Sequence, residues 1–221
     1  MQADEPPEAP YDCPLCPRLV GFRNMQRATH PDWFNGPVPS FGAQTARLLV
    51  VGLAPGLRGA NRTGRPFTGD FAGNLLYETL AAFGFATGTY RAEADDGFEL
   101  IDCMITNAVR CVPPANKPVG SEVATCNRFL KARIAALPRL RAIVALGRIS
   151  HEACLSALGL KRRQFPFAHA AEHGTGSLRL FDSYHCSRLN TNTGRLTREM
   201  FESVFAAVAI HLAVPGPAGS T

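Results

Sequence analysis

The sequence predicts an α/β fold, a single-domain three-layer sandwich in which a short, mainly parallel sheet lies between helices. Strand-like apolar runs alternate with helix-like segments along the chain. The strand-like runs are apolar throughout, as in parallel sheets that are covered on both faces. The 221 residues, 46% of them hydrophobic and 19% charged, are enough for one domain with a full core.

Four strands and four helices are expected in alternation. The strands are predicted at 46–54, 98–106, 141–147 and 177–185, and the helices at 73–84, at 121–137 opening on Ser121, at 150–160 and after Thr197. The last helix is the clearest, because Thr197 suits a cap and apolar residues follow at helical spacing up to Leu212. Loose termini are expected at 1–12 and 214–221, which leaves 13–213 as the domain.

Charge and composition limit the classes of function that are possible for this protein. The formal net charge is +5 and the pI is about 9.0, which favours a polyanionic partner such as nucleic acid. Runs of about 18 apolar residues are absent, so no membrane contact is expected. The start "MQADEPPEAP" lacks the basic and apolar regions of a signal peptide, which predicts a cytoplasmic protein with reduced thiols. Seven cysteines, an odd number, then need a reason other than disulfides.

Ligands of open α/β sheets bind beyond the carboxyl ends of the strands, where "VVGLAPGLRGANRTGRPFTGD" (50–70) follows the first strand. Its glycines let the backbone approach a ligand closely, and its three arginines suit phosphate contacts. The arginines are Arg58, Arg62 and Arg65. The loop lacks the Gly-Lys-Ser/Thr ending of a P-loop and the GxGxxG of dinucleotide sites. An ordinary surface loop with solvated arginines is the alternative.

Two later loops also carry polar groups at strand ends. In "TNAVRCVPPANKP" (106–118), Asn107 directly follows a strand, and its amide offers the donor and acceptor that a nucleobase edge needs. In "SYHCSRLNTNTGRLT" (183–197), His185 ends a strand and precedes hydroxyls, amides and arginines suited to phosphates. The alternatives are an Asn that satisfies a local turn and a His with a structural hydrogen bond.

Four cysteines could form one four-thiolate site. Cys13 and Cys16 form "CPLC", and Cys111 and Cys126 lie 15 residues apart much later. A zinc ribbon normally uses two close pairs, whereas a [4Fe–4S] cluster accepts varied spacings. The spacing matches neither common ferredoxin pattern, so an iron–sulfur site, a zinc site and chance stay open. The other three cysteines, Cys103, Cys154 and Cys186, are expected in the core.

The stretches "GLAPGLRGANRTGRPFTGD", "TNAVRCVPP" and "HCSRLNTNTGRLT", together with these four cysteines, resemble the uracil-DNA glycosylase superfamily. More closely, they resemble its type-b, family-5 iron–sulfur branch, over nearly the whole chain from Cys13 to the last helix. The resemblance implies a monomer that acts on uracil-containing DNA in repair, flipping uracil and other deaminated bases and hydrolysing their N-glycosidic bond. It also implies a structural [4Fe–4S] cluster on Cys13, Cys16, Cys111 and Cys126.

The resemblance also implies roles for single residues. Ala54 and Leu57 stand where other glycosylases carry a water-positioning acid or Asn, so Asp70 is the expected catalytic carboxylate. His185 would lie near the uracil O2 and stabilise charge on the leaving base. Phe67 would stack on the flipped base, Asn107 would read its edge, and further substrate contacts are expected from Gly52, Ala54 and Asn116.

The third motif is expected to wedge into the duplex or grip its backbone. Its DNA-contacting residues would be Ser187, Arg188, Asn190 and Arg195, in addition to the three arginines of the first loop. Cys186 replaces the proline that the family often has after the motif histidine. The rival interpretation is a non-catalytic iron–sulfur or zinc DNA-binding protein. A relative that binds its product covalently is disfavoured, because the chain lacks the inserted basic loop of that relative.

Overall fold

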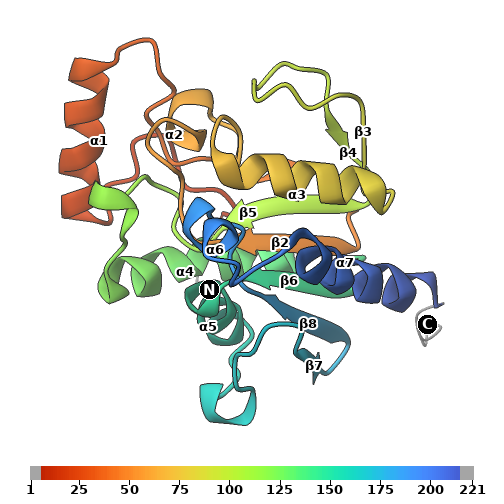
Figure 1. The fold of residues 1–221 in the computed structure, drawn as a ribbon. Coiled ribbons are helices and arrows are strands. Elements are labelled where there is room, and N and C mark those ends of the chain that lie inside the picture. Colours follow the sequence, from red (N-terminus) through yellow and green to blue (C-terminus); the bar gives the residue numbers. More distant parts are fainter. Residues whose placement is uncertain (1–5, 215–221) are drawn as a thin grey trace.

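A computed structural model describes residues 6–214 and shows a six-stranded sheet in the order β1-β5-β2-β6-β8-β7 (Figure 1). The four central strands are parallel, and the short edge strands run antiparallel to their neighbours. In chain order, the strands of this sheet are β1 (Phe41–Gly42), β2 (Leu48–Gly52), β5 (Cys103–Asn107), β6 (Ala142–Leu146), β7 (Glu172–Thr175) and β8 (Leu178–Ser183).

Helices cover both faces of the sheet. The helices α3 (Phe71–Ala82) and α7 (Arg198–Ala213) lie on one face, and α4 (Gly120–Ala135) and α5 (Arg148–Ala157) lie on the other (Figure 1). Successive residues of β2 enter opposite cores: Leu48 and Val50 pack in the α3/α7 core, whereas Leu49 packs in the α4/α5 core. The predicted three-layer α/β sandwich is therefore confirmed.

One predicted strand, 98–106, is broken in the structure. Its first part forms β4 (Glu99–Leu100), which pairs with β3 (Ala86–Thr87) in a separate two-stranded sheet. The chain turns at Asp102, whose φ is 53° and whose carboxylate accepts a hydrogen bond from the backbone N–H of Arg47. The other predicted strands and helices begin and end within three residues of their expected positions, and Thr197 caps α7 by accepting a hydrogen bond from Met200 N.

Several elements were not expected. The helix α1 (Pro17–Thr29) follows the first cysteine pair, and the polar loop after His185 contains the short helix α6 (Arg188–Asn192). The remaining short elements are α2 (Ala60–Thr63), η1 (Pro114–Asn116) and η2 (Arg162–Gln164). Residues 6–12 also differ from a loose terminus, because Glu8 forms ion pairs with Arg110 and Arg133. The predicted loose stretches at 1–5 and 215–221 lie outside the described residues.

The sheet order places a ligand site between β2 and β6. The chain passes from β2 to β5 on one side and then crosses to β6 on the other side of β2. The loops that leave β2 and β6 therefore diverge and open a crevice at the carboxyl ends of these strands. Among residues 6–214, no helix has the length and apolar character needed to span a bilayer.

Candidate active site and cysteine-lined site

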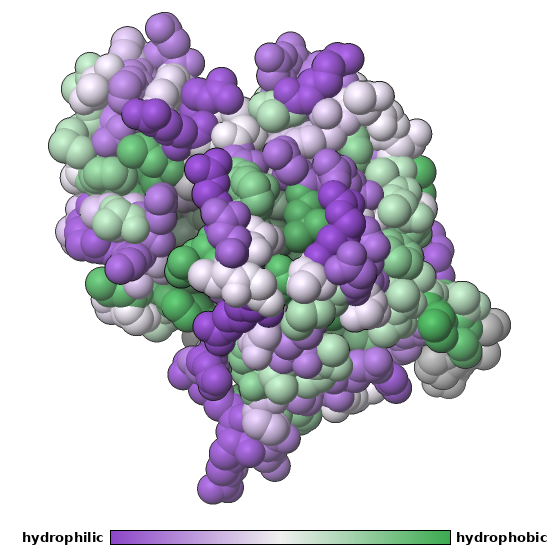
Figure 2. Space-filling model, in the orientation of Figure 1, coloured by the Kyte–Doolittle hydropathy of each residue, from purple (hydrophilic) through white to green (hydrophobic). Residues whose placement is uncertain are grey.

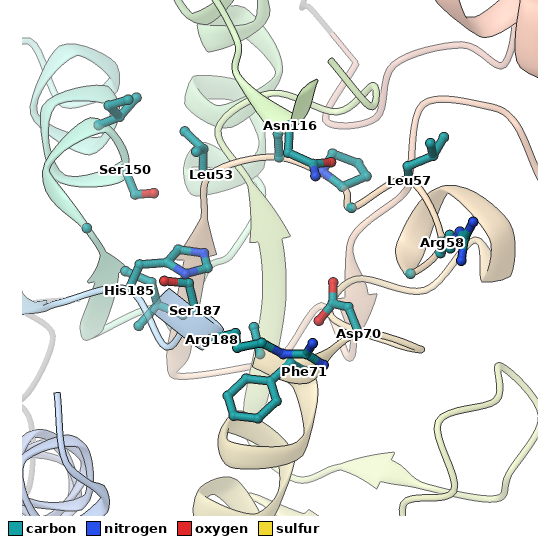
Figure 3. A pocket seen from close by; sticks show the side chains of 18 of the residues that line it. Leu53, Leu57, Arg58, Asp70, Phe71, Asn116, Ser150, His185, Ser187 and Arg188 are labelled. Carbon is teal, nitrogen blue, oxygen red and sulfur yellow. The ribbon is translucent and has the colours of Figure 1, made fainter. Parts of the chain in front are cut away.

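A cleft of about 720 Å³ opens at this edge of the sheet. Its walls come from the loop after β2, from the start of α5, from the segment after β8 and from the start of α3. On the face that carries α6, hydrophobic surface lies between rims of hydrophilic residues (Figure 2). Figure 3 shows Asp70 and His185 on opposite sides of this cleft.

Asp70 is held in place by the helix that it caps. Its Oδ1 accepts a hydrogen bond from Gly73 N at 3.2 Å at the start of α3. A Cβ on Gly59 would lie 2.7 Å from Asp70 Oδ2, and one on Gly56 would lie 3.0 Å from it, so both positions need glycine for this close approach. Burial raises the pKa of Asp70 above its usual value, although backbone N–H groups oppose the shift. Among the described residues, no basic side chain pairs with this carboxylate.

His185 follows β8 and faces the cleft with one buried nitrogen unbonded. Its Nδ1 has no hydrogen-bond partner in the described part of the chain, and burial lowers the pKa of His185 to about 4. The imidazole is therefore neutral at physiological pH and can donate one hydrogen bond. The amide of Asn190 donates to the backbone oxygen of His185 at 2.8 Å and fixes the start of the following turn.

Three predicted substrate residues lie together beside the floor of the cleft. A Cβ on Gly52 would lie 2.5 Å from both the Phe67 ring and Asn107 Oδ1, and Gly52 pairs with Asn107 in the sheet register. The Phe67 ring is nearly parallel to the His185 ring, with an angle of 25° and 6.0 Å between the centroids. An aromatic face, an amide and an imidazole thus converge, although Phe67 and Asn107 are buried and do not form the open wall.

The other two predicted substrate contacts lie on the wall itself. Asn116 is exposed at the end of η1, with φ of 55°, and its side chain borders the cleft (Figure 3). Ala54 borders the cleft and also packs against the cluster of cysteine side chains. Ala54 therefore borders both sites.

Most of the predicted DNA-binding residues are accessible. Arg58 and Arg188 are exposed at the cleft, and the Arg188 guanidinium lies 5.2 Å from the centre of the Phe71 ring. Arg62 is exposed beside Arg58, and Arg195 is exposed with its guanidinium over Tyr184.

The Ser187 hydroxyl lines the cleft and caps α6 by accepting a hydrogen bond from Asn190 N.

Arg65 corrects the prediction for this loop. Its side chain is buried and forms two hydrogen bonds with the Asp96 carboxylate, at 2.8 and 2.9 Å, and a third with Thr68. This guanidinium holds the pKa of Asp96 well below its usual range. Arg65 therefore braces the loop from inside and does not reach a phosphate. The Asn190 amide is likewise committed to the His185 backbone rather than directed toward DNA.

Sequence reasoning missed two residues, Leu189 next to the cleft residue Arg188 and Ser150 on the cleft wall. Leu189, on α6, is 72% exposed, more than any other large hydrophobic residue described as exposed. Ser150, near the start of α5, is buried at the cleft wall and its hydroxyl has no hydrogen-bond partner among the described residues. An isolated leucine within a polar run was a usable signal for Leu189, and the only signal for Ser150 was its position just after the predicted strand 141–147.

The four predicted metal-binding cysteines line one small pocket at the end of the sheet beside α1. Cys13 and Cys16 immediately precede α1, Cys111 follows β5, and Cys126 lies in α4. No three of their sulfurs lie within 4.8 Å of one another. A tetrahedral zinc site, with Zn–S bonds near 2.3 Å, would hold them only about 3.8 Å apart. The arrangement is wider than a zinc site, and the other three cysteines pack in the two main cores as predicted.

The surroundings of these thiols favour an anionic group. Arg23 is buried, donates to Cys111 Sγ at 3.6 Å and to the Cys13 backbone oxygen at 3.1 Å, and has no carboxylate partner within residues 6–214. The backbone N–H of Arg110 donates to Cys126 Sγ at 3.3 Å. Burial raises the pKa of Cys111 to about 11 and that of Cys126 to about 12. A buried cation beside desolvated thiols fits a negatively charged centre held by four thiolates.

Known proteins are similar in sequence to most of this chain. Residues 39–209 match the family model described as the uracil DNA glycosylase superfamily. A type-5 uracil-DNA glycosylase of Thermus thermophilus is 47% identical over 199 residues, covering 87% of this chain and 90% of the relative. A type-5 uracil-DNA glycosylase of Pyrobaculum aerophilum is 40% identical over 202 residues, covering 90% and 88%, respectively. The chain belongs to the uracil-DNA glycosylase superfamily.

Proposed function

We propose that this protein is a DNA repair glycosylase that hydrolyses the N-glycosidic bond of uracil in DNA. The observation that carries the proposal is the pair of Asp70 and neutral His185, which face each other across the cleft (Figure 3). The type-5 uracil-DNA glycosylases that the chain resembles support the same substrate and reaction.

The cleft accepts a nucleotide only after it has left the helix. Flipping costs a few kcal/mol and is cheapest for a mispaired base such as uracil opposite guanine. The flipped base would stack on Phe67 with its edge at the Asn107 amide, and the absence of a side chain at Gly52 lets these two side chains lie against the backbone of β2. Asn116 borders the entrance.

Bond cleavage separates charge, and the two faces of the cleft match the two products. As the C1′–N1 bond breaks, its electron pair moves to the uracil and the sugar becomes an oxocarbenium ion. The ionised Asp70 carboxylate, unpaired with any described cation, stabilises the positive sugar, and the N–H of His185 donates to uracil O2. Water then adds to C1′, and the proton that it loses ends on the uracil anion through solvent.

The rim of the cleft would hold the duplex. Arg58 and Arg188 are exposed at the cleft, Arg62 and Arg195 are also exposed, and all four suit phosphate oxygens. The Ser150 hydroxyl and the free N–H groups at the start of α5 provide a further phosphate contact. Leu189, exposed on α6 directly after Arg188, would fill the gap that the flipped nucleotide leaves in the stack. Because phosphate contacts release counterions, affinity should fall steeply with salt.

A [4Fe–4S] cluster would be held by Cys13, Cys16, Cys111 and Cys126. The wide sulfur arrangement and the buried Arg23 support this assignment over zinc. When bound, the cluster supplies a covalent tie between the segment before α1, the loop after β5 and α4. The residues that cleave the bond need no electron transfer from it.

Single-turnover excision tests the proposed function. Excess iron-loaded protein is mixed with an end-labelled duplex that contains one uracil opposite guanine, and abasic sites are revealed by alkaline cleavage. Wild type and His30→Ala, which changes a histidine stacked on Trp33 outside the cleft, should release uracil at similar rates. His185→Ala should be about 10²-fold slower or more. Intact duplex binding without uracil release would instead support a non-catalytic DNA-binding protein. The same assay with hypoxanthine, xanthine and hydroxymethyluracil defines the base range.

A further inference from the structure

A second group of ligating side chains lies on the α5 side of the sheet. His151 on α5, His173 on β7 and Asp182 on β8 bring one ligand atom each within 4.8 Å of the others. The His151 and Asp182 side chains are 2% and 0% exposed, and that of His173 is 11% exposed. None of the three lines the cleft, and the proposed glycosylase chemistry leaves them without a role.

The hydrogen bonds of His151 show that a positive charge is needed between it and Asp182. His151 Nε2 lies 2.9 Å from the backbone oxygen of Phe165, which can only accept, so Nε2 carries a proton. His151 Nδ1 lies 2.7 Å from Asp182 Oδ1. In a neutral imidazole the Nδ1 lone pair would face the carboxylate directly. Either a second proton or a metal ion must therefore lie between Nδ1 and the carboxylate.

Asp182 needs such a charge for a separate reason. Its carboxylate is fully buried, and an unpaired buried carboxylate is expensive. Within residues 6–214 its charged or chargeable partners are His151 and His173, whose Nε2 lies 3.1 Å from Asp182 Oδ2, and no lysine or arginine pairs with it. The negative charge of Asp182 is thus balanced only by a proton on one of the two imidazoles or by a metal ion that they bind.

We propose that His151 Nδ1, His173 Nε2 and the Asp182 carboxylate form a zinc site. Two imidazoles and one carboxylate, with water in the fourth position, are ordinary zinc ligands at about 2.0–2.2 Å, which places neighbouring ligand atoms roughly 3.3 Å apart. At present His151 Nδ1 lies 2.7 Å from Asp182 Oδ1 and His173 Nε2 lies 3.1 Å from Asp182 Oδ2, and one ligand atom of each residue lies within 4.8 Å of the others. The Phe165 carbonyl supplies the outer hydrogen bond that commonly fixes the tautomer of a zinc-binding histidine. The partly exposed His173 marks the side from which metal and water enter.

The site would brace the wall behind the cleft. His151 directly follows Ser150 on α5, and Asp182, near the end of β8, lies three residues before His185. Zinc would join α5, β7 and β8 without touching the substrate. The expected consequence is added stability rather than added chemistry.

Zinc uptake by the iron-loaded protein tests the proposal. Protein freed of loosely bound zinc is titrated with Zn²⁺ against a chromophoric chelator, with iron and zinc counted by elemental analysis. One zinc per chain is expected in wild type and in His30→Ala, and none in His173→Ala. His173→Cys, which restores a zinc ligand, should recover uptake. Zinc should raise the melting temperature of wild type and leave that of His173→Ala unchanged.

X-ray absorption at the zinc edge separates this site from the cysteine-lined one. Nitrogen and oxygen ligands without sulfur are expected in wild type, and Cys111→Ala should retain the zinc if it stays folded. The proposal is overturned by failure of wild type to bind zinc, by sulfur ligation of that zinc, or by undiminished uptake in His173→Ala. If His173→Ala fails to fold, the test uses His173→Cys alone. Zinc uptake by His173→Cys equal to that of wild type supports the proposal, and no zinc uptake by this variant overturns it.

Discussion

The cleft and the cysteine-lined site are neighbours with opposite electrostatic needs. Ala54 borders both. In the cleft, the unsatisfied groups are a carboxylate without a cation at Asp70 and a neutral nitrogen at His185. At the cysteines, the unsatisfied group is a cation without a carboxylate, Arg23. Buried polar groups are normally paired with a partner. Each of these unpaired groups therefore indicates the charge of the ligand that would bind at its site.

Under the proposed function, the two sites serve catalysis and stability separately. The proposed roles of the cleft groups lower a transition-state barrier at some cost to the folded state. The proposed anionic cluster at the cysteines would instead contribute to the folded state itself. Substitutions should therefore reduce the catalytic rate at one site and the stability at the other.

The largest effect is expected from Cys111→Ala. Removing one thiolate should lower iron to near zero per chain and reduce soluble protein, because α1 and α4 lose their shared tie. Elemental analysis and thermal melting measure both. Cys154→Ala removes a cysteine of similar burial from the α4/α5 core and should retain its iron. Normal iron in Cys111→Ala would remove this residue from the ligand set.

Asp70→Asn should separate rate from stability most clearly. Asparagine still caps α3, but it lacks the negative charge, so single-turnover excision should slow by about 10²-fold with duplex affinity retained. The raised pKa means that the folded state disfavours the ionised carboxylate, a cost that is present at neutral pH and disappears as pH falls through the folded pKa. The melting temperature at pH 7 should therefore hold or rise. A wild-type rate in this variant would move the catalytic role to other groups.

The pH dependence of the excision rate should test the protonation states proposed for His185 and Asp70. Because burial lowers the pKa of His185 to about 4, its neutral form persists well below pH 6.5, and the excision rate should show no titration near that value. On acidification, protonation of Asp70, at a pH above that of an ordinary aspartate, should reduce the rate. Single-turnover rates between pH 4.5 and 8 measure this, and a midpoint near 6.5 would contradict the neutral His185.

The smallest effect is expected from Leu189→Ala. An exposed side chain on α6 contributes little to the core, so melting should not change. Excision from a duplex should slow by about tenfold, because a wedge offsets unstacking energy of a few kcal/mol. Excision from single-stranded DNA should be unaffected, since no stack must be refilled. Equal losses on both substrates would exclude the wedge.

The sequence allowed most of the layered fold and the central site to be predicted. Helix α7 and the parallel strands have strong local patterns, and Asp70 and His185 were expected near each other because strand ends share one edge of the sheet, where both line the cleft. Arg65 was misjudged beside Arg58 because its burial depends on Asp96, 31 residues later. The break at Asp102 likewise depends on Arg47, and α1 escaped detection because Arg23 and Gln26 are among its few buried residues.

The arrangement of the cysteines also has a consequence for synthesis of the chain. Cys13 and Cys16 leave the ribosome about 110 residues before Cys126. At typical translation rates this interval is roughly 5–20 s, during which the first pair has no partners from the later half of the chain. Two thiols separated by two residues can oxidise to a disulfide in that time. Yield from cells should therefore depend on the reducing state and iron supply during translation, and delivery of iron afterwards should rescue only chains whose first pair stayed reduced.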